Sequence, residues 1–176
     1  KEYRRQRQMC IRDSFVVAHF HYTLMGGSVF GLFAGLHYWY PKFTGRMLNE
    51  KRAKRAFWLM FIGFNGTFLI QHSVGLEGMP RRIYEYGTGT GWQTENLIST
   101  VGSFVLAIGI LLATWNFISS LKNGAKSGPD PWTGNTLEWF TPSPPPANNF
   151  DVIPTVRSVE PMKDIRAELL RAGAGA

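Results

Sequence analysis

Two histidines near the start of a long apolar stretch constrain this chain more than any other feature of its sequence. The stretch runs from Phe15 to Tyr40, 26 residues without a Lys, Arg, Asp or Glu. At 1.5 Å per residue, a helix of this length can cross the ~30 Å hydrocarbon core of a membrane. His19 and His21 lie in its first third. Because ionisable side chains at membrane depth are costly, they indicate a functional site.

The spacing of the two histidines favours two separate binding partners. Residues two apart on an α-helix differ by about 200° in direction and about 3 Å in height. We therefore expect His19 and His21 to leave opposite faces of one helix, whereas ligands of one metal ion usually stand three or four residues apart. This geometry suits a helix placed between two cofactors. The alternative is that each imidazole bonds only to a neighbouring helix.

Two further apolar stretches, at about 57–75 and 97–119, predict two more membrane-spanning helices. The first span ends in aromatic residues typical of a water interface, and we expect the next residue, Pro41, to stop its helix. Asn65 and His72 lie within the second span. Because polar groups at this depth need partners inside the bundle, Asn65 is predicted to join two helices and His72 to make a structural hydrogen bond. The alternative for His72 is a place along a proton or water route.

The loops predict how the spans are oriented. Residues 42–55 carry six basic residues against Glu50, and such an excess marks the cytoplasmic side of a membrane rather than a nucleic-acid partner. The two histidines then lie near the outer surface, on the same side as Arg81 and Arg82 in the second loop. Two adjacent guanidiniums suit carboxylates, which they bind bidentately. The alternative is a surface pair bonding lipid phosphates.

Glycines at helical spacing predict close approach between helices. They occur in the first span and in the third. The residues are Gly27, Gly31 and Gly35, and then Gly102 and Gly109.

The two ends of the chain differ from the spans. Residues 1–14 hold the only cysteine, Cys10, and resemble translated sequencing-adapter DNA, so we exclude them from the native protein. The alternative is a basic arm that binds lipid headgroups. Without these five basic and two acidic residues, the net charge falls from +7 to +4. Residues 15–120 then form the membrane part.

Residues 121–176 are rich in Gly and Pro and predict an irregular tail on the cytoplasmic side, without a core of its own. Trp132 and Trp139 are expected to press against the cytoplasmic face. A short amphipathic helix is predicted at 161–171. The fold class is therefore all-α integral membrane, with three transmembrane helices followed by a Pro-rich tail.

The chain also resembles a known family. Residues 16–22 read Val-Val-Ala-His-Phe-His-Tyr, which is similar to the tenth transmembrane helix of subunit I of the haem–copper cytochrome c oxidases. The similarity continues through Gln-His at 71–72, Gly-Met-Pro-Arg-Arg at 78–82 and Pro-Trp at 131–132, and covers about residues 15–155. It implies that the three spans are the last three of a twelve-helix bacterial subunit, of which this chain is roughly the C-terminal quarter.

The resemblance implies a role for each candidate residue. His19 would be the axial ligand of a high-spin haem iron at the oxygen site, and so the catalytic residue. His21 would be an axial ligand of a low-spin haem, and Arg81 and Arg82 would bind haem propionates. Both haems would be of the a type, and the ligands of copper B would lie outside this chain. Asp13 stands one residue too close to His19 to align with the family's magnesium ligand.

The implied function is that of a proton-pumping cytochrome c oxidase in the bacterial plasma membrane, which takes electrons from cytochrome c and reduces O2 to water. Its partners would be oxidase subunits II and III, cytochrome c, O2 and the lipid bilayer. This chain alone is not expected to catalyse the reaction. A quinol oxidase is the alternative within the family, although Pro80 and Gln71 favour the cytochrome c branch. A transporter with histidines in its proton path would explain neither their opposite faces nor the arginines on their side.

Overall fold

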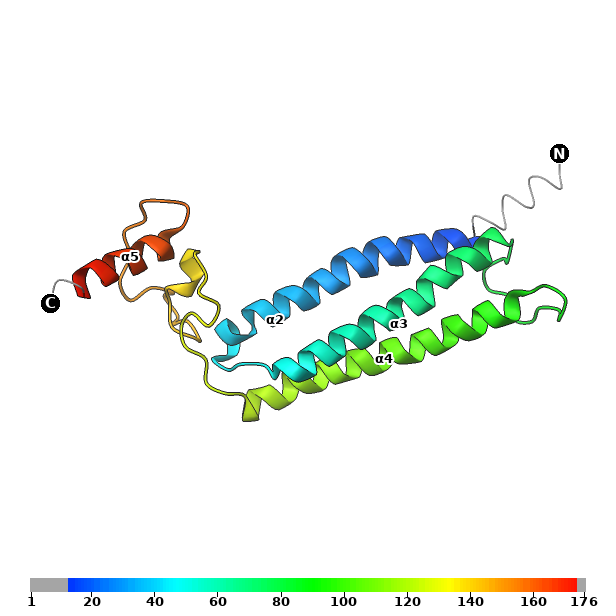
Figure 1. Cartoon of the computed structure of the whole chain (residues 1–176), viewed down its shortest axis with the longest axis horizontal. Helices are drawn as coiled ribbons and strands as arrows, with labels where there is room; N and C mark the ends of the chain where they lie inside the picture. Colours follow the sequence, from blue (N-terminus) through cyan, green and yellow to red (C-terminus); the bar gives the residue numbers. More distant parts are fainter. Residues whose placement is uncertain (1–12, 174–176) are drawn as a thin grey trace. The chain divides into compact units, whose positions relative to one another are not determined.

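The computed structural model describes residues 13–173, which contain helices and no β-strand. Most of the excluded N-terminal arm, including Cys10, lies outside this range. A first helix spans Asp13–Thr44. It is α-helical at 13–21 and continues as the π-helix η1 (Tyr22–Val29) and the α-helix α2 (Phe30–Thr44). The later elements are α3 (Glu50–Leu76), α4 (Trp92–Asn123), the short 3-10 helix η2 (Leu137–Trp139) and α5 (Pro161–Gly173), as Figure 1 shows.

Within residues 13–173, three helices are long and apolar enough to cross a membrane, which confirms the predicted all-α membrane fold. They are the first helix, α3 and α4. Many of their large apolar side chains point outward, such as Leu24 at 60% exposure and Leu111 at 68%. Such faces suit hydrocarbon or further apolar helices.

The chain forms two compact units. The first contains the described residues up to Ala34 together with Glu50–Asn116, and the second contains Gly35–Asn49 together with the described residues from Phe117 onward. Consequently α2 and α4 each contribute residues to both units.

Within the first unit, α3 and α4 run side by side in opposite directions (Figure 1). They touch where glycines leave room for the neighbouring backbone. A Cβ on Gly102 would lie 2.6 Å from the backbone of Gly66, and one on Gly109 would lie 2.7 Å from the nitrogen of Met60. The predicted packing role of Gly102 and Gly109 is thus confirmed.

The glycines of the first span behave differently. A Cβ on Gly27 or Gly31 would meet no described atom within 4 Å, and one on Gly35 would meet only its own neighbour Trp39. Gly26 instead faces α3, where a Cβ would touch the ring of Phe64 at 3.5 Å. The prediction that these three glycines bring another helix close therefore finds no contact within the described residues.

Several helix boundaries differ from prediction, and α4 extends beyond the predicted 97–119 at both ends. Pro41 does not end the first helix, which continues to Thr44 with Pro41 buried inside it. A proline removes a single N–H donor, and Gly45, at φ 68°, ends the helix by donating to the Pro41 carbonyl at 2.8 Å. Further on, α3 already begins at Glu50, because charged residues there form regular helical turns outside the apolar stretch.

The second unit has a small core, contrary to the prediction of a tail without one. Trp139 is 0% exposed, and its Nε1 donates to the hydroxyl of Tyr38 at 3.2 Å. The indole of Trp132 donates to the Tyr38 carbonyl at 2.9 Å while its ring stays 42% exposed. The predicted terminal helix is present as α5, where Arg166 donates to backbone carbonyls at Thr133 and Gly134.

Candidate functional site

The α-helical segment at 13–21, called here the histidine-bearing segment, packs on one face of α3. Ala18 is fully buried and marks the inward side of the segment. The ring of His21 stacks on Phe68, with centroids 4.6 Å apart and an interplanar angle of 12°. The ring of His19 meets His72 edge to face at 6.3 Å. Because Phe68 and His72 stand four residues apart, they share a face of α3.

The backbone of this segment is α-helical, so His19 and His21 leave it about 200° apart. They therefore depart on either side of buried Ala18. Among residues 13–173, no group of three His, Cys, Asp or Glu side chains could share a metal ion.

A backbone carbonyl orients the His21 ring. Its Nδ1 lies 2.7 Å from the carbonyl oxygen of Val17. With the proton on Nδ1, the ring donates to this carbonyl and keeps the lone pair of Nε2 for a metal. His72 is held similarly, with Nδ1 2.8 Å from the Phe68 carbonyl, which confirms its predicted structural hydrogen bond.

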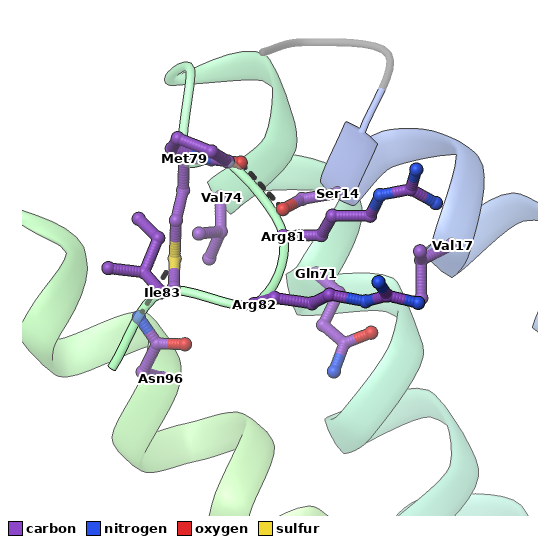
Figure 2. A pocket seen from close by; sticks show the side chains of 10 residues that line it. Ser14, Val17, Gln71, Val74, Met79, Arg81, Arg82, Ile83 and Asn96 are labelled. Carbon is purple, nitrogen blue, oxygen red and sulfur yellow. Dashed lines mark hydrogen bonds between the residues drawn. The ribbon is translucent and has the colours of Figure 1, made fainter. Parts of the chain in front are cut away.

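A cavity of about 190 Å3 joins the histidine-bearing segment to the arginine pair. Figure 2 shows both arginine side chains extending from their loop toward the side on which Val17 lies. The segments that the sequence places on one side of the membrane thus meet at one end of the helices. The cavity is lined by Ser14, Val17, Gln71, Val74, Met79, Pro80, Arg81, Arg82, Ile83 and Asn96.

Met79 holds the arginine-bearing loop. Its amide donates to the Val74 carbonyl at 3.2 Å, and its carbonyl accepts from the Ser14 hydroxyl at 2.6 Å. Its sulfur lies 3.3 Å from Nδ2 of Asn96 (Figure 2). Arg82 adopts a left-handed φ of 62°, a conformation uncommon for side chains other than Gly, Asn and Asp.

Sequence reasoning missed several of these contacts. It gave no contact to Met79, which it quoted only as part of the motif at 78–82, and it did not name Asn96; it also excluded Asp13 and Ser14, which are helical here. Arg81 forms an ion pair with Asp13, Nε to Oδ1 at 3.5 Å, with both side chains partly exposed; such a pair contributes at most about 1 kcal/mol. Neither local spacing nor composition predicts these contacts, since Ser14 and Met79 lie 65 positions apart.

Comparison with known proteins identifies the family. The model of cytochrome c and quinol oxidase polypeptide I matches residues 10–105, more than half of the chain. The chain belongs to this family. It is 52% identical over 149 residues to cytochrome c oxidase subunit 1 of Bacillus subtilis, 52% over 149 residues to that of Corynebacterium diphtheriae, and 51% over 149 residues to that of Alkalihalophilus pseudofirmus.

Each of these alignments covers 84% of the chain but only 24% to 26% of the relative. The chain therefore spans about a quarter of the length of the oxidase subunits it matches. Membership in this oxidase family favours the oxidase hypothesis over the transporter.

The residues present fit a haem on two counts. His21 can offer Nε2 to an iron while its Nδ1 is held by Val17, and neutral imidazole is a common axial ligand of haem. Arg81 and Arg82 line a cavity at the same helix end, and guanidinium groups pair well with carboxylates such as haem propionates.

Proposed function

We propose that this chain is part of the catalytic subunit of a respiratory terminal oxidase. In this proposal, electrons pass from cytochrome c through a low-spin haem to a haem–copper site that reduces O2 to water, coupled to proton pumping across the bacterial plasma membrane. Oxidase subunits II and III would be its partners. The proposal is supported by membership in this family and by the cavity that places Arg81 and Arg82 beside Ser14 and Val17, at the end of the helix that carries both histidines.

The residues would divide the work as follows. By resemblance to the family, His19 would bind the iron of the oxygen site, and His21 would bind the low-spin iron. The haems, of the a type, supply the one-electron chemistry when bound. Arg81 and Arg82 would hold the propionates and stay charged at any working pH. The ligands of copper B would come from parts of the subunit outside this chain.

A difference spectrum of the whole oxidase tests the two histidine assignments. We expect His21→Ala to remove the low-spin haem signal from the reduced-minus-oxidised spectrum and to leave the high-spin signal. His19→Ala should do the reverse. His37→Ala is a suitable control, because His37 packs against Phe117 in the second unit at a centroid distance of 4.9 Å. An unchanged low-spin signal in His21→Ala would contradict the assignment.

A quinol oxidase is the second candidate, since the matching family includes quinol oxidases. The relatives compared above are all named cytochrome c oxidase subunit 1, which favours the cytochrome c branch. Metal analysis of the purified complex separates the two. A dinuclear copper centre in the partner subunit supports cytochrome c as donor, and its absence together with quinol oxidation supports the alternative.

A further inference from the structure

Immediately after His21, the side chain of Tyr22 reaches across to α3. Its hydroxyl lies 2.5 Å from Oδ1 of Asn65 and joins residues 43 positions apart. The direction of this hydrogen bond follows from the other end of the amide. Because Nδ2 of Asn65 donates to the Phe61 carbonyl at 2.8 Å, Oδ1 is the acceptor and Tyr22 the donor. Asn65 thus joins two helices, as its position in an apolar span predicts.

The ring of Tyr22 is held as well as its hydroxyl. Its centroid lies 4.7 Å from that of Phe64 and 5.4 Å from that of His72. His21 stacks on Phe68, which lies between these two residues on the same face of α3. The ring and the hydroxyl of Tyr22 are therefore both held on the face of α3 that also contacts the His21 ring.

The position of Tyr22 along the helix gives this contact its importance. Tyr22 is the first residue of η1, where α-helical winding gives way to eight residues of π-helix. At the far end of η1, the amide of Phe30 is shared between the carbonyls of Gly27 and Met25. π-Helical segments are rare in proteins, and those that occur often lie at functional sites. The contact between Tyr22 and Asn65 therefore lies at the junction between the α-helical turn that carries the histidines and the π-helical segment.

We propose that Tyr22 and Asn65 are positioning residues that set the rotation of the helix at His19 and His21. The hydrogen bond in turn sets the direction in which each imidazole meets its iron. This inference rests on the proposed function, because it assigns the histidines to haem irons. Neither Tyr22 nor Asn65 is expected to touch a reacting group.

Electron paramagnetic resonance of the oxidised whole enzyme gives a direct test. The principal g values of a low-spin ferric haem depend on the relative orientation of its axial imidazole planes. We expect Tyr22→Phe to shift the largest g value by more than its line width and to broaden it. Asn65→Leu should produce the same shift. The double variant should shift no further than either single one, because both remove one hydrogen bond.

Tyr40→Phe is the matched control. It removes a hydrogen bond of similar length, from the Tyr40 hydroxyl to the Phe117 carbonyl at 2.6 Å, and it should leave the g values unchanged. Wild-type g values in both Tyr22→Phe and Asn65→Leu would overturn the inference. Loss of both haems together with the folded subunit in these two variants would overturn it too, since it would assign the pair to folding alone.

Comparison with the His21→Ala variant separates this inference from the proposed function. If His21→Ala retains the low-spin signal, the haem assignment itself fails. If His21→Ala loses that signal while Tyr22→Phe and Asn65→Leu both keep wild-type g values, only the positioning role fails.

Discussion

A buried lysine in the last turn of α2 offers a sharp test of how the tail is held. Lys42 is only 5% exposed, and its ammonium group donates to the carbonyls of Thr141 at 2.7 Å and Pro129 at 3.0 Å. The same nitrogen lies 5.2 Å from the centre of the Trp139 ring. All of these residues belong to the second unit. Replacement by Met keeps the side-chain length and removes every one of these polar contacts.

The expected loss can be worked from these contacts. Thr141 is 6% exposed, so its carbonyl would be left without a donor, at a cost of about 1–3 kcal/mol. Pro129 is exposed, and water can replace the lysine there. The cation over Trp139 adds about 0.5–2 kcal/mol, whereas removing a buried charge offsets part of the total. We expect Lys42→Met to destabilise the tail by about 2 kcal/mol, a factor of about 30 in its opening equilibrium.

Hydrogen exchange of the purified subunit in detergent measures this opening. The backbone amides of Trp139, Phe140 and Met162, which bond within the tail, should exchange about 30-fold faster in Lys42→Met. Lys126→Met is the control, because Lys126 is exposed in the same unit, and should change these rates by less than twofold. Equal rates in wild type and Lys42→Met would refute the reasoning that this lysine holds the tail.

Three further predictions follow from packing and charge. Gly102→Ala should lower the stability of the subunit by about 1–3 kcal/mol, because its Cβ would lie 2.6 Å from the backbone of α3; an unchanged stability would contradict this contact. Trp139→Ala empties a fully buried site and should cost about 3–5 kcal/mol, seen as faster proteolysis confined to the tail. The hydrogen bond from Lys163 holds the pKa of Glu160 below its ordinary 4.5 and raises that of Lys163 above its ordinary 10.5. The pair should therefore stabilise the start of α5 fully between those two ordinary values. This stabilisation should fall as the pH drops through the lowered pKa of Glu160, and also as the pH rises through the raised pKa of Lys163. Amide protection factors at this turn that stay constant from pH 3 to 7, after correction for the intrinsic exchange rate, would contradict the prediction.

The sequence predicts the membrane helices well because their cause is local. A long run without charge has few structures available in a bilayer, and polar residues within it need partners, as Asn65 and His72 find. Successive loops between membrane spans lie on alternate sides of the membrane. The sequence therefore also predicts that the histidine-bearing segment and the arginine loop lie at the same end of the helices. For the same reason, the terminal helix could be predicted from the residues of α5 themselves.

The remaining features depend on distant contacts or on details of winding. Hydropathy marks only the apolar part of α3, so its charged first turns from Glu50 are missed. The tail core depends on Trp139 meeting Tyr38, 101 positions away, which no local pattern reveals. Pro41 was expected to stop a helix, yet burial and the closure at Gly45 outweigh one missing donor. The contacts of Met79 with Ser14 and Asn96 cannot be predicted from the motif at 78–82, because they form only when the loop is folded.

The change from α-helical to π-helical winding after His21 should let the first helix tolerate the deletion of one residue, unlike α3. A π-segment holds an extra residue relative to α-helical register. Deleting one residue between Tyr22 and Val29 could be absorbed by tightening the coil, with both flanks left in place. In α3 the same deletion would turn every later side chain by about 100° and carry His72 away from the histidine-bearing segment.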